Sequence, residues 1–164
     1  EVEKLAQRRV GLKSGANIVI DQAEALVAID VNSAKASGRG DEAKVPEGKG
    51  KGKRGRDRRG GDLEETVFAV NKEAAAEIGK QLRLRDLGGI IVIDFIDMTR
   101  DDHKRKVVEA LRRYLSKDPA KTEVNNISPL GLVEMTRART GKTIESISFG
   151  KCPFCDGRGR VKIP

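Results

Sequence analysis

The stretch GGIIVIDFIDMTR, at residues 88–100, decides the fold because its apolar run ends on a carboxylate. β-Branched aliphatic residues fill that run and favour a buried strand, yet Asp94 follows at once and Asp97 comes three positions later. The stretch ALVAIDVNS, at residues 25–33, repeats the pattern with Asp30 at its end. Two buried strands that each end on an acid suggest one shared site.

A helix is expected between these two strands, over residues 62–87. Asp62 and Glu65 have the spacing of a capping box at its start, and the two glycines at 88–89 are expected to end it. One helical face is marked by Val67, Val70, Ala74, Ile78 and Leu82. Because strand, helix, strand is the signature of parallel neighbouring strands, both acids should lie at one edge of the sheet.

The remaining elements complete an α/β fold with a mixed sheet. Three short strands are expected between residues 8 and 33, a helix over 100–117 with Thr99 as its N-cap, and two strands at 122–128 and 131–137. Apolar residues occupy both faces of the strand that ends near Asp30, so we expect both faces of the sheet to be covered.

The net charge of +8 favours an anionic partner, with nucleic acid the default. Most of it comes from GKGKGKRGRDRRGG, at residues 48–61, which has seven Lys or Arg and one Asp. We expect a flexible insert at 38–60, since so few apolar residues cannot offset the entropy of ordering. The insert either grips phosphates or is a tolerated surface insertion. Its candidate RNA contacts are Lys49, Lys51, Lys53 and Arg54.

Two arginines lie at the end of the last expected strand, in EMTRART at residues 134–140. Arg137 and Arg139 either contact RNA phosphates or are ordinary exposed charges, and the sequence leaves both interpretations open. The single histidine, His103, is expected to be a solvated residue of the second helix.

The cysteine pair in CPFC, Cys152 and Cys155, offers two thiolates where structural zinc needs four ligands. A zinc ion shared by two chains is favoured over a redox pair, because Gly157 and Gly159 argue against a following helix. Two cysteines without others do not make a secreted disulfide framework, and no apolar run reaches the ~20 residues of a membrane span. These observations favour a reducing cytoplasm.

Asp30, Asn32 and Asp94 form an oxygen-rich set that suits Mg²⁺, which binds through one or two carboxylates, keeps waters and takes substrate phosphate oxygens. Such an ion lowers the pKa of a bound water and stabilises a phosphoryl transition state. The alternative is that acids at strand ends cap the next element or pair with surface lysines. Two acids on adjacent strands, with an Asn beside one, favour the metal.

Four segments resemble the catalytic region of the ribonuclease E/G family, in order and over nearly the whole chain. They are RVGLKSGANIVIDQAEALVAIDVNSAK, GDLEETVFAVNKEAAAEIGKQLRLRDLGGIIVIDFIDM, GLVEMTRAR and CPFCDGRGRV. The resemblance implies a deoxyribonuclease-I-like catalytic subdomain at 1–139, then a linker and a zinc-link motif at 140–164. It implies an Mg²⁺-dependent endoribonuclease that cleaves single-stranded RNA in RNA processing and decay. A non-catalytic RNA-binding fragment that assembles through zinc is the alternative.

The resemblance also assigns roles to residues that match the family's motifs. The acid of AIDVNS and the first acid of VIDFIDM hold the metal in that family, which implies Asp30 and Asp94, with Asn32 supporting the site. The family's CPxC motif is a zinc link between two protomers, which implies Cys152 and Cys155. The implied partners are single-stranded RNA, a second copy in a dimer that the family can extend to a tetramer, and other RNA-decay proteins.

Overall fold

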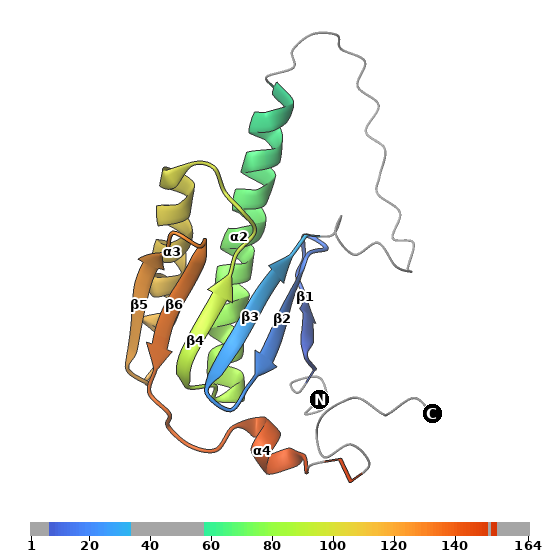
Figure 1. The fold of residues 1–164 in the computed structure, drawn as a ribbon, viewed down its shortest axis with the longest axis vertical. Coiled ribbons are helices and arrows are strands. Elements are labelled where there is room, and N and C mark those ends of the chain that lie inside the picture. The colour runs from blue at the N-terminus through green and yellow to red at the C-terminus, as the bar shows by residue number, and fades with distance from the viewer. Residues whose placement is uncertain (1–6, 34–57, 151, 154–164) are drawn as a thin grey trace.

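A six-stranded mixed sheet and two long helices form two layers in this computed structural model, which describes residues 7–33, 58–150 and 152–153 (Figure 1). The strand order is β1-β2-β3-β4-β6-β5. The strands are β1 (Arg9–Gly11), β2 (Asn17–Gln22), β3 (Leu26–Asn32), β4 (Gly89–Asp94), β5 (Thr122–Ile127) and β6 (Leu132–Arg137). The helices are α2 (Arg58–Arg85), α3 (Asp101–Leu115) and α4 (Ile144–Ser148). The expected α/β fold with a mixed sheet is confirmed.

β3 and β4 are parallel and α2 connects them, as the strand–helix–strand pattern predicted. The other neighbouring pairs of strands are antiparallel. The carboxyl ends of β3 and β4 therefore point the same way, toward the upper end of Figure 1, whereas α4 lies at the opposite end.

Both ends of α2 differ from the prediction. The helix begins at Arg58, inside the expected insert, so that position 62 lies within the helix and is not its N-cap; extension of a formed helix adds one hydrogen bond per residue. At the other end Asp86, with φ of 52°, takes the left-handed conformation ahead of the two glycines. The Leu87 N–H donates to the Leu82 carbonyl at 3.0 Å, which is the hydrogen bond of a Schellman motif.

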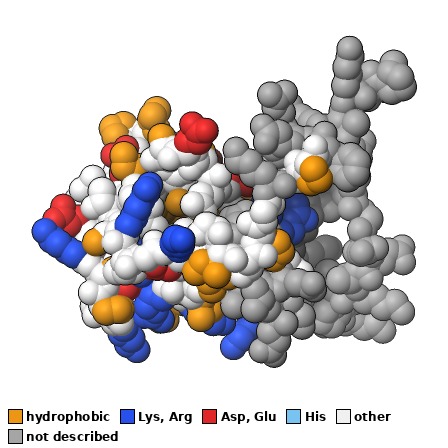
Figure 2. Space-filling view, turned by 90° about the horizontal axis from the view of Figure 1, so that it is seen from below, with side chains coloured by type: hydrophobic (Ala, Val, Ile, Leu, Met, Phe, Trp, Pro, Cys, Tyr) orange, Lys and Arg blue, Asp and Glu red, His pale blue; other side chains and the backbone are white. Residues whose placement is uncertain are grey.

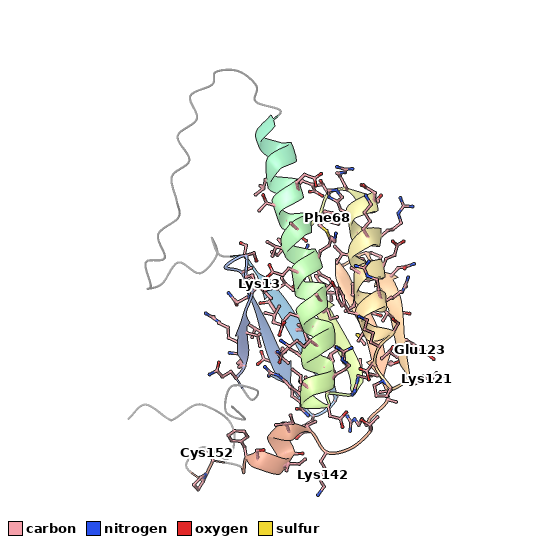
Figure 3. The ribbon with its side chains drawn as sticks, turned by 180° about the vertical axis from the view of Figure 1, so that it is seen from behind. Lys13, Phe68, Lys121, Glu123, Lys142 and Cys152 are labelled. Atoms are coloured by element: carbon pink, nitrogen blue, oxygen red, sulfur yellow. The ribbon has the colours of Figure 1, made fainter. Side chains whose placement is uncertain are left out.

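The two long helices pack on one face of the sheet only (Figures 1 and 3). Val27, Ile29 and Val31 of β3 point into that layer and are buried. On the other face Ala28 is exposed and Ile90 is 54% exposed. The expectation that both faces are covered is wrong for the described part of the chain, because its long helices lie on the same side.

α3 begins after Arg100, whose side chain makes no capping hydrogen bond. The expected N-cap, Thr99, donates its hydroxyl to Glu64 of α2 instead, at 2.8 Å. α4 occupies part of the segment expected to be a linker, and Thr143 accepts from the Ser146 N–H at its start. In the described part of the chain, no helix combines the length and the apolarity needed to cross a membrane.

Candidate functional site

Asp30 and Asp94 are register partners across the parallel pair β3 and β4, and both are exposed on the open face of the sheet. Neighbouring strands lie about 4.8 Å apart, so the two carboxylates stand side by side. The row continues outward to Val19 on β2 and to Leu132 on β6, both half-buried. Two exposed acids are thus held between two half-buried aliphatic side chains.

A hydrogen bond and a raised pKa describe this pair further. The Asn32 amide donates to Oδ2 of Asp30 at 2.7 Å, which orients that carboxylate and leaves its other oxygen for a ligand. Burial raises the pKa of Asp94, and the negative charges of Asp30 and Asp97 raise it further. The site therefore has uncompensated negative charge, which a bound cation would neutralise.

The donor set fits a hard divalent cation. Asp30 and Asp94 supply carboxylate oxygens, and Mg²⁺ commonly binds through one or two carboxylates while it keeps several waters. Asn17, the register partner of Asn32, is buried, and its Oδ1 has no hydrogen-bond partner among the described residues. Within residues 7–33, 58–150 and 152–153, no three His, Cys, Asp or Glu side chains gather closely enough to hold a metal by themselves.

The segment that leaves Asp94 toward α3 is held by α2. The side chain of Asn71 pairs with both main-chain groups of Ile96, donating to its carbonyl at 2.8 Å and accepting from its N–H at 3.1 Å. Glu64 accepts from the N–H groups of Thr99, at 3.1 Å, and Arg100, at 3.2 Å. Neither Asn71 nor Glu64 is predictable from the sequence as a residue that supports the site, because both lie on the helix and meet the segment only after folding.

Asp97, in the same segment, lines a cavity of about 290 Å³ beside the site. The opposite wall is the turn at 127–131 between β5 and β6, which carries Leu130, 84% exposed. Phe95, Ile96 and Met98 of the same segment and Lys104 of α3 complete the lining. The cavity thus combines one acid, one base and an exposed aliphatic side chain next to the Asp30–Asp94 pair.

His103 is buried, 2% exposed, and the expectation that it is solvated is wrong. Its ring stacks on Phe68 with centroids 4.2 Å apart, and its Nδ1 lies 3.1 Å from Oε1 of Glu64. Figure 3 shows Phe68 in the half of α2 that lies nearer the segment between β4 and α3. The histidine faces α2 because α3 packs on that helix. The sequence of α3 alone does not show which of its residues make this contact.

Arg137, interpreted from the sequence as either an RNA contact or an ordinary exposed charge, is also buried, with 4% of its surface exposed. Its guanidinium donates to Asp118 at 2.9 Å and to Asp86 at 2.9 Å. Burial would raise the pKa of Asp118, but hydrogen bonds from Arg137 and from the Ala120 N–H lower it overall. The structure corrects both interpretations, because a buried and doubly paired guanidinium is not an exposed charge and does not face a ligand.

The other candidate RNA and zinc residues divide between described and undescribed parts of the chain. Arg139 is exposed. Cys152 is exposed, while Cys155 lies outside the described residues, as do the four candidate cations of the insert: Lys49, Lys51, Lys53 and Arg54. Figure 2 shows the end of the molecule that carries α4, where basic side chains are scattered among hydrophobic ones.

Comparisons with known proteins agree in pointing to one family. The sequence model described as "Ribonuclease E/G family" matches residues 1–45 and 53–140. "Ribonuclease G" of Salmonella typhimurium is 44% identical over 162 residues, which are 99% of this chain and 29% of that protein. "Ribonuclease E" of Escherichia coli K12 is 46% identical over 162 residues, or 99% of this chain and 13% of that protein. The chain thus spans less than a third of these relatives.

Proposed function

The chain belongs to the ribonuclease E/G family, and from this premise we propose that it is the catalytic part of an endoribonuclease that cleaves single-stranded RNA. The observation that carries the proposal is the register pairing of Asp30 with Asp94 on the open face. The proposal includes a role in RNA processing and decay, in the cytoplasm, together with other RNA-decay proteins. The names of the relatives support the ribonuclease activity.

Magnesium would be held by Asp30 and Asp94. When bound, it would supply Lewis-acid stabilisation of the phosphoryl group and lower the pKa of a bound water. Asn32 holds the Asp30 carboxylate in one orientation through its 2.7 Å hydrogen bond. Val19 and Leu132 flank the two carboxylates in the same row. The open face leaves room for an RNA strand above the carboxylates.

Two further features belong to the proposal. A zinc ion bound by Cys152 and Cys155 of one chain and the same pair of a second chain would join two protomers, because tetrahedral zinc needs four ligands. Arg139 and the cations of the insert would bind phosphates of the RNA. The family match is interrupted at residues 46–52, inside the expected insert at 38–60, so the insert is a point where the chain departs from its family.

The experiment is a cleavage assay with the full chain and a fluorescent single-stranded RNA. We expect internal cleavage that requires Mg²⁺, stops with a chelator, and is much slower on a perfect duplex. Substitution Asp94→Asn should abolish cleavage, whereas Asp101→Asn, at an acid 88% exposed on α3, should leave it unchanged. RNA binding without Mg²⁺-dependent cleavage by the wild-type protein would instead support the non-catalytic RNA-binding fragment.

A further inference from the structure

The segment between β4 and α3, residues 95–100, carries Asp97 away from the paired carboxylates. Asp94 is fixed by strands on both sides, β3 and β6. Beyond it, the N–H groups of residues 96, 99 and 100 are bonded by side chains of α2. The position of Asp97 relative to Asp94 therefore depends in part on α2.

Asn71 makes the more specific of these contacts. Its side chain is fully buried, and its carboxamide pairs with both the N–H and the carbonyl of Ile96. A neighbouring strand forms the same reciprocal pair with a residue of a β-ladder. The carboxamide thus extends the constraint on β4 past Asp94, at the residue immediately before Asp97.

Glu64 makes the second contact, two helical turns before Asn71 and on the same face of α2. Its two oxygens accept from the N–H groups of Thr99 and Arg100. The carboxylate is itself held by His103, which stacks on Phe68. The two contacts therefore fix the segment on both sides of Asp97.

We propose that Asn71, supported by Glu64, is a positioning residue for the RNA-cleavage site. By fixing the main chain at Ile96, it holds the Asp97 carboxylate near enough to Asp94 for their charges to interact, in the wall of the cavity that Asp97 lines. This inference rests on the proposed function. Asn71 acts through the main chain and does not touch the RNA or the cation.

A matched control separates positioning from simple stabilisation. Glu73, also on α2, accepts from the N–H of Lys13 at 2.6 Å and from the N–H of Ser14 at 3.2 Å. Glu73→Gln and Glu64→Gln therefore make the same chemical change in two similar contacts on one helix. Glu73 holds the turn between β1 and β2, whereas Glu64 holds the segment of Asp97.

The test compares full chains that carry Asn71→Ala, Glu64→Gln or Glu73→Gln. We expect Asn71→Ala to lower kcat for single-stranded RNA by about tenfold or more and to change KM by less than about threefold, since small misplacements cost rate more than binding. Amide hydrogen exchange should show lost protection at Ile96 in Asn71→Ala, and at Thr99 and Arg100 in Glu64→Gln. Glu73→Gln should keep the wild-type kcat.

Several results would overturn the positioning role. One is a folded Asn71→Ala protein with wild-type kcat; another is an equal loss of kcat in Glu73→Gln. If Asn71→Ala does not fold, Glu64→Gln decides, and an unchanged kcat there rejects the proposal. A wild-type chain that does not cleave RNA would reject the proposed function and, with it, this role. A wild-type chain that cleaves RNA, with an unchanged kcat in the variants, would reject only the positioning role.

Discussion

Asp30 on β3 and Asp94 on β4 are register partners in a parallel pair, although the whole of α2 separates them along the chain. No local interaction brings them together; the right-handed return of the chain through a helix does. Because both side chains emerge on the face that α2 and α3 do not cover, the core and the candidate site are built from opposite sides of the same two strands.

Removing Arg137 from its buried ion pairs should strongly destabilise the fold. Arg137→Ala would leave Asp118, whose side chain is fully buried, without its cation, and breaking such a pair costs about 3 kcal/mol. Lys121→Ala removes an exposed pair with Glu123 and should cost less than about 1 kcal/mol. Urea unfolding of both variants checks this, and equal losses would contradict the structural role of Arg137.

Glu64 makes the stability of the segment at 95–100 depend on pH. Hydrogen bonds from the N–H and the hydroxyl of Thr99 lower the pKa of Glu64 from 4.5 to about 2. A lowered carboxyl pKa stabilises the folded state above pH 4.5, and this contribution is lost as the pH falls toward 2. The difference in unfolding free energy between wild type and Glu64→Gln should therefore shrink over that range. A difference that stays constant between pH 6 and pH 3 would contradict these hydrogen bonds.

The arrangement of strands and helices could largely be predicted from the sequence. Alternation and apolar runs indicate the strands, and the strand–helix–strand order is enough to place Asp30 and Asp94 at one edge. The ends of α2 were harder to predict. Its start at Arg58 depends on how far a formed helix extends, and its end before Asp86 depends on which residue accepts a positive φ.

The contacts between distant segments could not be predicted. His103 is buried because α3 packs it against Phe68. Arg137 is buried because two acids from separate turns converge on it. The sequence around an arginine at a strand end does not reveal such distant partners. Asn71 looks like an ordinary helical residue until Ile96 lies against it.

The proposed zinc link predicts a stoichiometry. Two thiolates per chain would leave a tetrahedral zinc half-ligated, and a second copy related by a two-fold axis would complete it. Metal analysis with light scattering should give one zinc per two chains, and Cys152→Ser should lose zinc and shift the protein toward monomer. One zinc per chain, or a zinc-free dimer that persists in the variant, would contradict the shared site.

The basic tract should act on RNA affinity and not on turnover. Deletion of residues 44–57, which leaves α2 intact, should flatten the salt dependence of RNA binding, since each phosphate contact on a single strand contributes a slope of about 0.7. The value of kcat at saturating RNA should stay at the wild-type level. An unchanged slope would identify the tract as an insertion without a role in binding.

Turnover of single-stranded RNA by Asp30→Asn and Asp94→Asn, over a titration of Mg²⁺, tests the central claim most directly. Each substitution keeps the size of the side chain but removes one of the two carboxylates, so we expect turnover to fall by about 100-fold or more at every Mg²⁺ concentration. Asp101→Asn is the control, and unfolding curves should show that all three variants fold. Turnover within about tenfold of wild type in either folded variant would contradict the Asp30–Asp94 site.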